Sequence, residues 1–364
     1  MRFFKIEKSK MVGLAKRLSE THAVFIPARA DQGYLRFCKL DFRSEKQNVE
    51  SIETLSFWGY RNTIIPPKEV FFPQTEVLFT FSEQMPELSV AIQPLPTVIL
   101  GIRPCDARAI NFLDKVFINK DTQANIENGA GNFNDPYYAE KRGRSVIISL
   151  ACNNPQSTCF CTSLGGSPDG EAGADIILFD LHENLIARPV SKKGEEFIGE
   201  FRDWFKEPGE KELNKKNELV AASRDRMRPI EGILNAEAKL DNLFADFLWN
   251  EIHMKCLGCG ICTYLCPTCH CFDITDEVRN KRGRRLRCWD SCMFPSFTLH
   301  ASGHNPRPTY RERMRQRIMH KFNYCPKNFR EIFCVGCGRC VRNCPVNLDI
   351  REIICRILET KNAK

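Results

Sequence analysis

The sequence predicts an α+β protein, in which an N-terminal α/β domain is followed by a mainly α-helical domain. Short apolar runs bounded by Pro and Gly alternate with helical spacing over roughly the first 200 residues, as in α/β domains. After residue 236 the apolar positions recur at helical i, i+3, i+4 spacing. Two regular cysteine quartets lie in that second part. We place the boundary so that the domains are 1–225 and 226–364.

The first domain contains four predicted strands, at residues 77–81, 98–102, 146–150 and 176–179. The last is followed by LHENLIARPV, which indicates a hairpin with Asn184 near its turn. Residues 107–116 have helical spacing, with Asp106 as the expected N-cap, and 157–175 are rich in loop-forming residues. No G-x-G-x-x-G motif follows a strand, so no dinucleotide site is indicated.

The second domain begins after a highly charged connector over residues 206–235 that becomes helical. We expect one amphipathic helix from Ala236, with an apolar face made by Leu240, Leu243, Phe244, Phe247, Leu248 and Ile252. A second apolar face follows the last cysteine quartet and comprises Leu348, Ile350, Ile353, Ile354, Ile357 and Leu358.

Composition narrows the class of protein. Hydrophobic residues make up 43% and charged residues 27% of the 364, which favours a packed core over disorder. No apolar run approaches the roughly 18–20 residues that cross a bilayer, so we expect no membrane span. The start, MRFFKIEKSK, lacks the features of a secretory signal, so we expect a cytoplasmic protein whose 19 cysteines are reduced. Metal or redox chemistry is therefore favoured over a disulfide framework.

The tandem cysteine motif is the most specific feature. Two quartets, each C-x2-C-x2-C-x3-C-P, are separated by 78 residues at every position: Cys256, Cys259, Cys262, Cys266 and Cys334, Cys337, Cys340, Cys344. This spacing is typical of [4Fe–4S] ligation, in which three thiolates surround one cluster and the fourth reaches the neighbouring cluster. The prediction is that Cys344 completes the first cluster and Cys266 the second. Zinc is the alternative, but zinc sites usually use two separated pairs of ligands.

Four further cysteines predict a third cluster. Cys105 follows one predicted strand directly, and Cys152, Cys159 and Cys161 follow another. If these strands are neighbours in one sheet, their C-terminal loops converge at the same edge. Buried structural cysteines are the alternative, although C-x6-C-x-C in a polar loop is unusual for packing.

Seven cysteines and two basic runs remain. Cys269, Cys271, Cys288 and Cys292 form either a fourth cluster or packing beside the second, whereas Cys38, Cys325 and Cys355 are isolated. The runs KRGRRLR (281–287) and YRERMRQR (310–317) are either solvated counter-charge for the clusters or a docking surface for an acidic redox partner. Three clusters of about −2 each would offset most of the formal charge of +8. No aromatic-interleaved basic motif indicates nucleic acid.

With these residues in view, the chain resembles the family of 4Fe-4S dicluster electron-transfer proteins that includes the sulfhydrogenase β subunit and its counterpart in anaerobic sulfite reductase. The resemblance rests on GIRPCDARAI, CNNPQSTCFC, CLGCGICTYLCPTCHCFD, WDSCMF, GHNPRP and CVGCGRCVRNCP, and covers most of residues 55–355. It implies a helical ferredoxin domain after an α/β domain and supports the third cluster. Cys269, Cys271 and Cys292 also match family positions, whereas Cys288 and Cys325 do not map clearly.

The resemblance implies a function and its partners. Members relay electrons between a flavin subunit, which takes them from NAD(P)H, and a catalytic subunit of the siroheme sulfite reductase or [NiFe] hydrogenase type. The expected chain is therefore a non-catalytic subunit of an anaerobic oxidoreductase complex. Two alternatives stay open: a reductase whose own cluster binds a small oxyanion or disulfide, for which the spare cysteines are the motive, and a zinc-stapled interaction module.

Overall fold

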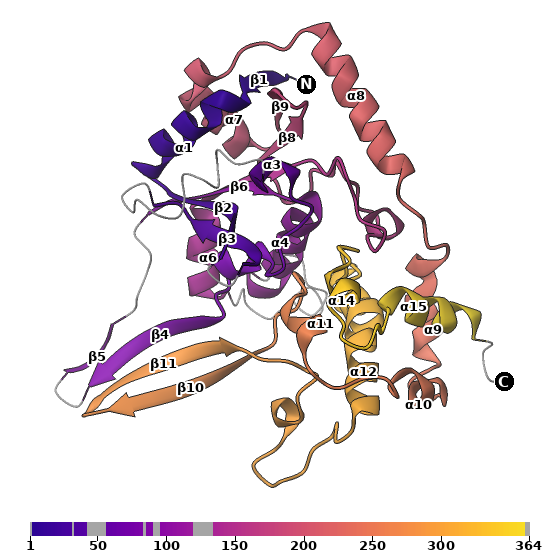
Figure 1. Ribbon diagram of the computed structural model, residues 1–364. Coiled ribbons are helices and arrows are strands. Elements are labelled where there is room, and N and C mark those ends of the chain that lie inside the picture. Colours follow the sequence, from indigo (N-terminus) through magenta and orange to yellow (C-terminus); the bar gives the residue numbers. More distant parts are fainter. Residues whose placement is uncertain are drawn as a thin grey trace.

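The computed structural model describes residues 2–30, 33–41, 56–82, 85–89, 95–118 and 134–360. A seven-stranded sheet occupies the N-terminal half, in the order β1-β9-β8-β7-β6-β2-β3 (Figure 1). Its strands are β1 (Phe4–Glu7), β2 (Ala23–Arg29), β3 (Leu35–Lys39), β6 (Thr97–Ile102), β7 (Ser145–Leu150), β8 (Ile176–Asp180) and β9 (Asn184–Pro189). The four central strands are parallel, and β9, β1 and β3 pair antiparallel at the edges.

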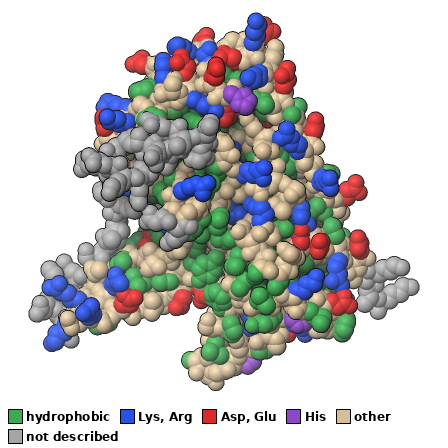
Figure 2. Space-filling view, viewed as in Figure 1, with side chains coloured by type: hydrophobic (Ala, Val, Ile, Leu, Met, Phe, Trp, Pro, Cys, Tyr) green, Lys and Arg blue, Asp and Glu red, His purple; other side chains and the backbone are tan. Residues whose placement is uncertain are grey.

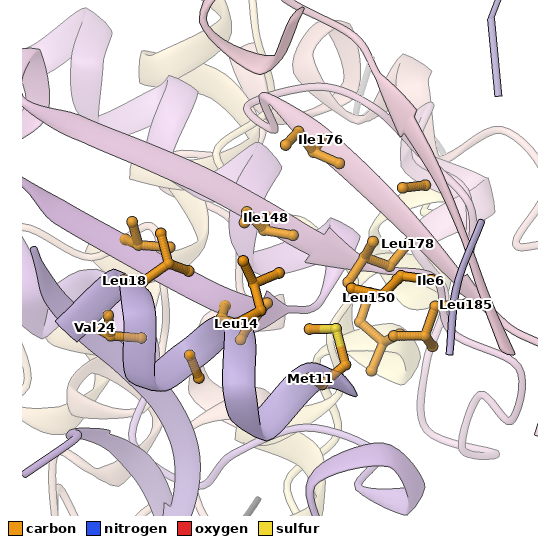
Figure 3. Packing of buried hydrophobic residues seen from close by; sticks show 14 of the residues in the cluster. Ile6, Met11, Leu14, Leu18, Val24, Ile148, Leu150, Ile176, Leu178 and Leu185 are labelled. Carbon is orange, nitrogen blue, oxygen red and sulfur yellow. The ribbon is translucent and has the colours of Figure 1, made fainter. Parts of the chain in front are cut away.

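Helices cover both faces of this sheet because its central strands are apolar on both sides. On one face lie α1 (Met11–Ser19) and α7 (Lys192–Glu200), and on the other α4 (Pro104–Phe117) and α6 (Pro136–Gly143). Figure 3 shows Leu14 of α1 near Ile148 of the sheet, and Leu18 of the same helix belongs to the same buried cluster. The alternation is strict on β7, where Ile148 faces α1 and its neighbour Ile147 faces α4. The presence of both helices and strands agrees with the predicted α+β class.

The expected strands and hairpin are present, although the strand expected at 77–81 lies in a second sheet and not with the others. Asp106 does not cap a helix. Helix α4 begins at Pro104, with Arg103 at the N-cap position and no capping side chain. Proline is favoured in the first turn because its missing N–H has no helical partner there. Asp106 lies inside that turn, where it forms an ion pair with Arg339. The prediction failed because the capping rule is local, whereas the partner of Asp106 is distant in the sequence.

The charged connector forms α8 (Glu210–Asp225), a largely exposed helix that leads from the sheet to the C-terminal half (Figure 1). The single amphipathic helix expected from Ala236 is wrong. The chain instead forms α9 (Ala236–Asp241) and α10 (Leu248–Ile252), with Phe244 and Phe247 exposed on the segment between them. Leu240, Leu243 and Leu248 are buried as expected, so the helical spacing identified most of the buried positions but not the break.

The C-terminal half packs around α12 (Tyr310–Met319), which continues through the π-helix η7 (His320–Tyr324) into α13 (Cys325–Phe329). Helix α15 (Ile350–Glu359) follows the second quartet, as expected, and buries Ile350, Ile353, Ile354 and Ile357. Phe333 stacks on Phe112 of α4 with ring centroids 5.1 Å apart, so the two halves share packed contacts. No helix among the described residues is both long and apolar enough to cross a membrane.

A four-stranded sheet extends away from the rest of the protein as an arm (Figure 1). It has the order β10-β11-β4-β5 and comprises β4 (Thr75–Ser82), β5 (Met85–Ser89), β10 (Phe272–Arg279) and β11 (Arg282–Trp289). The pairing of β11 with β4 joins segments about 200 residues apart, and no strands were expected from the sequence over 272–289. Figure 2 shows Lys and Arg side chains gathered at the outer end of this arm, where the run KRGRRLR lies.

Candidate functional site

The first cavity, called cavity one, is lined by Cys256, Cys259, Cys262 and Cys344. Met293, Met314 and Leu348 complete an apolar wall, and the empty volume is about 440 Å³ with the space open to solvent included. Cys259 is exposed, whereas the other three cysteines are half-buried. The motif predicts that three cysteines of the first quartet and the last cysteine of the second quartet share one cluster. These four thiols therefore surround one space near the protein surface.

The second cavity, called cavity two, is lined by Cys266, Cys334, Cys337 and Cys340. Its empty volume is about 340 Å³, and Cys334 and Cys337 are buried. Each cavity thus takes three cysteines from one quartet and the fourth from the other quartet, which is the arrangement that the motif predicts.

The two quartets fold in the same way. The four-residue helices α11 (Ile261–Tyr264) and α14 (Arg339–Arg342) occupy equivalent places in the repeat, and each has a left-handed glycine, Gly260 or Gly338, at its N-cap. At Gly336 a Cβ atom would lie 2.5 Å from the backbone of Phe160 and Cys161. Glycine is needed at that position because the loop of the second quartet presses against the loop that contains Cys161.

The third cavity, called cavity three, is lined by Cys105, Cys152, Cys159 and Cys161. Strands β6 and β7 are parallel neighbours, so Cys105 after β6 and Cys152 after β7 lie at the same edge of the sheet. Arg103 stabilises this edge, since its Nη1 donates to the carbonyl of Ala151 at 2.8 Å. The empty volume of about 370 Å³ falls between those of the other two cavities.

The three cavities share walls. Gly336 and Cys337 line both cavity two and cavity three. Phe160 donates its backbone N–H to the carbonyl of Gly336 at 2.9 Å, which joins the two loops directly. Arg317 lines both cavity one and cavity two. The cavities therefore form a row, with cavity two in the middle.

Burial makes the free thiolates unfavourable. It raises the pKa of Cys340 to about 12 and that of Cys334 to about 11 in cavity two. In cavity three burial raises the pKa of Cys161 to about 12, and burial together with the Asp106 carboxylate raises that of Cys105 well above its usual value. Sulfurs in such places are stable as thiolates only with a bound metal or nearby cations.

Buried cations supply part of that compensation. Lys321 is 3% exposed, and its Nζ donates to Cys266 Sγ at 3.2 Å and to Thr268 Oγ1 at 3.0 Å. Burial lowers the pKa of Lys321, but attraction to Cys266 and Cys269 outweighs it and leaves the pKa well above its usual value. Sequence reasoning missed Lys321; its spacing of four residues from Arg317 on a helix was the available signal.

The arginines of the second basic run, YRERMRQR, lie on two different faces of α12. Arg313 and Arg317 of α12 are buried, whereas Arg311 and Arg315 are only half-buried. The counter-charge interpretation therefore fits the inward arginines of YRERMRQR. In the first run Arg287 is also buried and pairs with Glu76, while Arg284 and Arg285 form exposed pairs on the arm.

The leftover cysteines contact different partners. The thiols of Cys271 and Cys292 form a hydrogen bond with each other. This bond lowers the pKa of Cys271 to about 7 and raises the pKa of Cys292 well above its usual value. Cys269 instead donates to the Cys266 thiol, whose pKa falls well below its usual value. Cys288 lies on β11 opposite Asp273. A fourth cluster at these residues stays a prediction.

The donor set of the three cavities fits cubane iron–sulfur clusters. Each has four cysteine sulfurs around one space, and cubane clusters are held by four thiolates. Arg317 gives an independent indication. Among the described residues, no carboxylate lies within ion-pair distance of it, and its buried Nε has no hydrogen-bond partner. An anionic group in the adjoining cavities would provide the counter-charge that this guanidinium lacks. In the described part of the chain, the three cavities included, no group of three or more His, Cys, Asp or Glu side chains is placed to hold a single metal ion.

Comparison with known proteins agrees with this site. The 4Fe-4S dicluster domain family matches residues 255–348, which include both quartets. The whole chain is similar to Sulfhydrogenase 2 subunit beta of Pyrococcus furiosus, with 33% identity over 363 residues that cover 99% of each chain. No solved structure matches it. The chain therefore belongs to the family of sulfhydrogenase β subunits, iron–sulfur proteins of electron transport with a 4Fe-4S dicluster domain.

Proposed function

We propose that this chain is a non-catalytic relay subunit that carries electrons along three [4Fe–4S] clusters, one in each cavity. Cys256, Cys259, Cys262 and Cys344 hold the first; Cys266, Cys334, Cys337 and Cys340 the second; Cys105, Cys152, Cys159 and Cys161 the third. When bound, each cluster exchanges one electron at a time. The protein fixes the order of the clusters and adjusts their potentials through hydrogen bonds to sulfur, nearby charge and burial.

One observation supports the proposal above all others: three cavities, each lined by four cysteines, lie in a row with shared walls. The cysteines of cavity two are half-buried or buried, and its walls are shared on both sides, so it suits transfer between its neighbours.

The relay implies a partner at each end. We propose that a flavin subunit that oxidises NAD(P)H delivers electrons, and that a catalytic subunit of the sulfite reductase or [NiFe] hydrogenase type receives them, in a cytoplasmic anaerobic complex. The relative from Pyrococcus furiosus is named as one subunit of a sulfhydrogenase, which supports a complex of several subunits. We also propose that the chain divides near residue 225 into the α/β domain with the third cluster and the domain with the other two.

Metal analysis of anaerobically purified protein tests the relay. Three clusters give about 12 iron and 12 sulfide per chain, and two give about eight of each. Cys105→Ser should remove about four iron atoms, whereas Cys355→Ser on α15 should remove none. Protein with zinc and no sulfide would overturn the proposal. Substrate-dependent changes in the EPR spectrum of the isolated chain, with small oxyanions or disulfides, would instead support a reductase.

A further inference from the structure

A row of buried cations follows the helix that passes the first two cavities. Arg313, Arg317 and Lys321 occur at four-residue spacing along α12 and η7, so their side chains lie on one face. All three are 3–4% exposed. The Nη1 of Arg313 donates to the carbonyls of Arg307 and Pro308 at 2.9 Å each, whereas its Nε, like that of Arg317, is buried without a hydrogen-bond partner. Arg317 lines two of the cysteine cavities, and Lys321 donates to a cysteine sulfur.

Arg317 occupies a different position from Lys321. It lines both cavity one and cavity two, and the thiols that act most strongly on its charge are Cys262 from cavity one and Cys340 from cavity two. Lys321 lines cavity two alone and donates to Cys266. Burial of an unpaired guanidinium is strongly unfavourable, so Arg317 requires negative charge in the spaces it faces.

We propose that the buried charge of Arg317 raises the reduction potentials of both the first and the second cluster, whereas the charge of Lys321 raises the potential of the second cluster alone. This inference rests on the proposed function. The physical reason is electrostatic: an added electron makes a cluster more negative, and a fixed buried cation stabilises the more negative state. Since one guanidinium faces two centres, its removal must shift both potentials in the same direction.

The test is a redox titration of the anaerobically purified full chain, followed by EPR, with iron and sulfide measured on the same samples. In Arg317→Gln the ratio of reduced to oxidised cluster at a fixed potential should fall at least about tenfold for both clusters, equivalent to about 59 mV for a one-electron couple. In Lys321→Gln the same fall should be confined to one of these two clusters. Arg315→Gln removes an equal charge from the same helix at a half-buried site and should leave both potentials unchanged.

The outcomes separate this inference from the proposed function. Wild-type protein without clusters overturns the relay itself. Wild-type clusters whose potentials do not move in Arg317→Gln, or of which only one moves, overturn the shared role while the relay stands. If Arg317→Gln loses iron, the variant Arg317→Lys is measured next. If Arg317→Lys keeps both clusters near their wild-type potentials, the charge is what is required, and the inference is supported. If Arg317→Lys also loses iron, the side chain has a packing role, and the inference is overturned.

Discussion

Arg339 and Asp106 form a buried bidentate ion pair between the two halves of the chain, with Nη1–Oδ1 and Nη2–Oδ2 separations of 2.5 and 2.7 Å. Both side chains are 1% exposed. Arg339 lies on α14 directly before Cys340, and Asp106 lies on α4 directly after Cys105. The pair therefore connects a cysteine of cavity two to a cysteine of cavity three through the backbone, and fixes the separation of the two cavities.

Asp106→Asn should destabilise the protein by about 3–5 kcal/mol, because it leaves a buried guanidinium without its counter-charge. The control is Asp276→Asn on the arm, which removes an equally well-formed pair with Arg285 at 2.8 and 2.7 Å that is exposed to solvent. That change should cost less than about 1 kcal/mol. Anaerobic denaturant unfolding measures both variants, and similar losses in the two would contradict the role assigned to burial.

If each of the first two clusters takes three ligands from one quartet and the fourth from the other, the motif predicts which pairs of cysteines hold the same cluster. Cys256→Ala with Cys344→Ala removes two thiols from cavity one and should release about four iron atoms. Cys256→Ala with Cys266→Ala removes one thiol from each of two cavities and should affect the binding of about eight iron atoms. Iron content and EPR measure the difference between variants that lack the same number of cysteines. The reverse pattern would mean that each quartet holds its own cluster.

Gly336→Ala should destabilise the contact between cavities two and three. The residue has φ +63°, and a Cβ atom would meet the backbone of Phe160 and Cys161 at 2.5 Å. Gly303→Ala is the matched control, because Gly303 has φ +82° with no atom within 4 Å of its Cβ position. The control should lose about 1–2 kcal/mol from backbone strain alone. Gly336→Ala should lose more in denaturant unfolding and also lose iron; equal effects would show that the close contact is unimportant.

Chelation should remove the clusters in a fixed order. Cys259 is exposed, whereas Cys161, Cys334 and Cys337 in the other cavities are buried. A hydrophilic iron chelator should therefore release about four iron atoms rapidly and the rest slowly, because it reaches only cavity one without local unfolding. The time course of iron release measures this. Cys344→Ala should lack the rapid phase, and a single phase in the wild type would contradict the order.

Several features could be predicted from the sequence because they are local. The quartets form similar loops, since three thiols two residues apart lie close together whatever surrounds them. Grouping the four cysteines of cavity three required one further fact, that the strands before Cys105 and Cys152 are neighbours in a parallel sheet. Helix α15 followed from the spacing of its isoleucines. By contrast, spacing alone did not reveal the break between α9 and α10.

The sequence by itself determined how the eight cysteines of the two quartets group together and the chemistry that their spacing favours. Only the tertiary structure decided that the cavities lie in a row, that Asp106 pairs with Arg339, that Arg317 faces two cavities at once, and that β11 pairs with β4 in an arm. The reason is physical: loop and helix geometry depends on residues a few positions apart, whereas burial and pairing of charges depend on segments that meet only after folding.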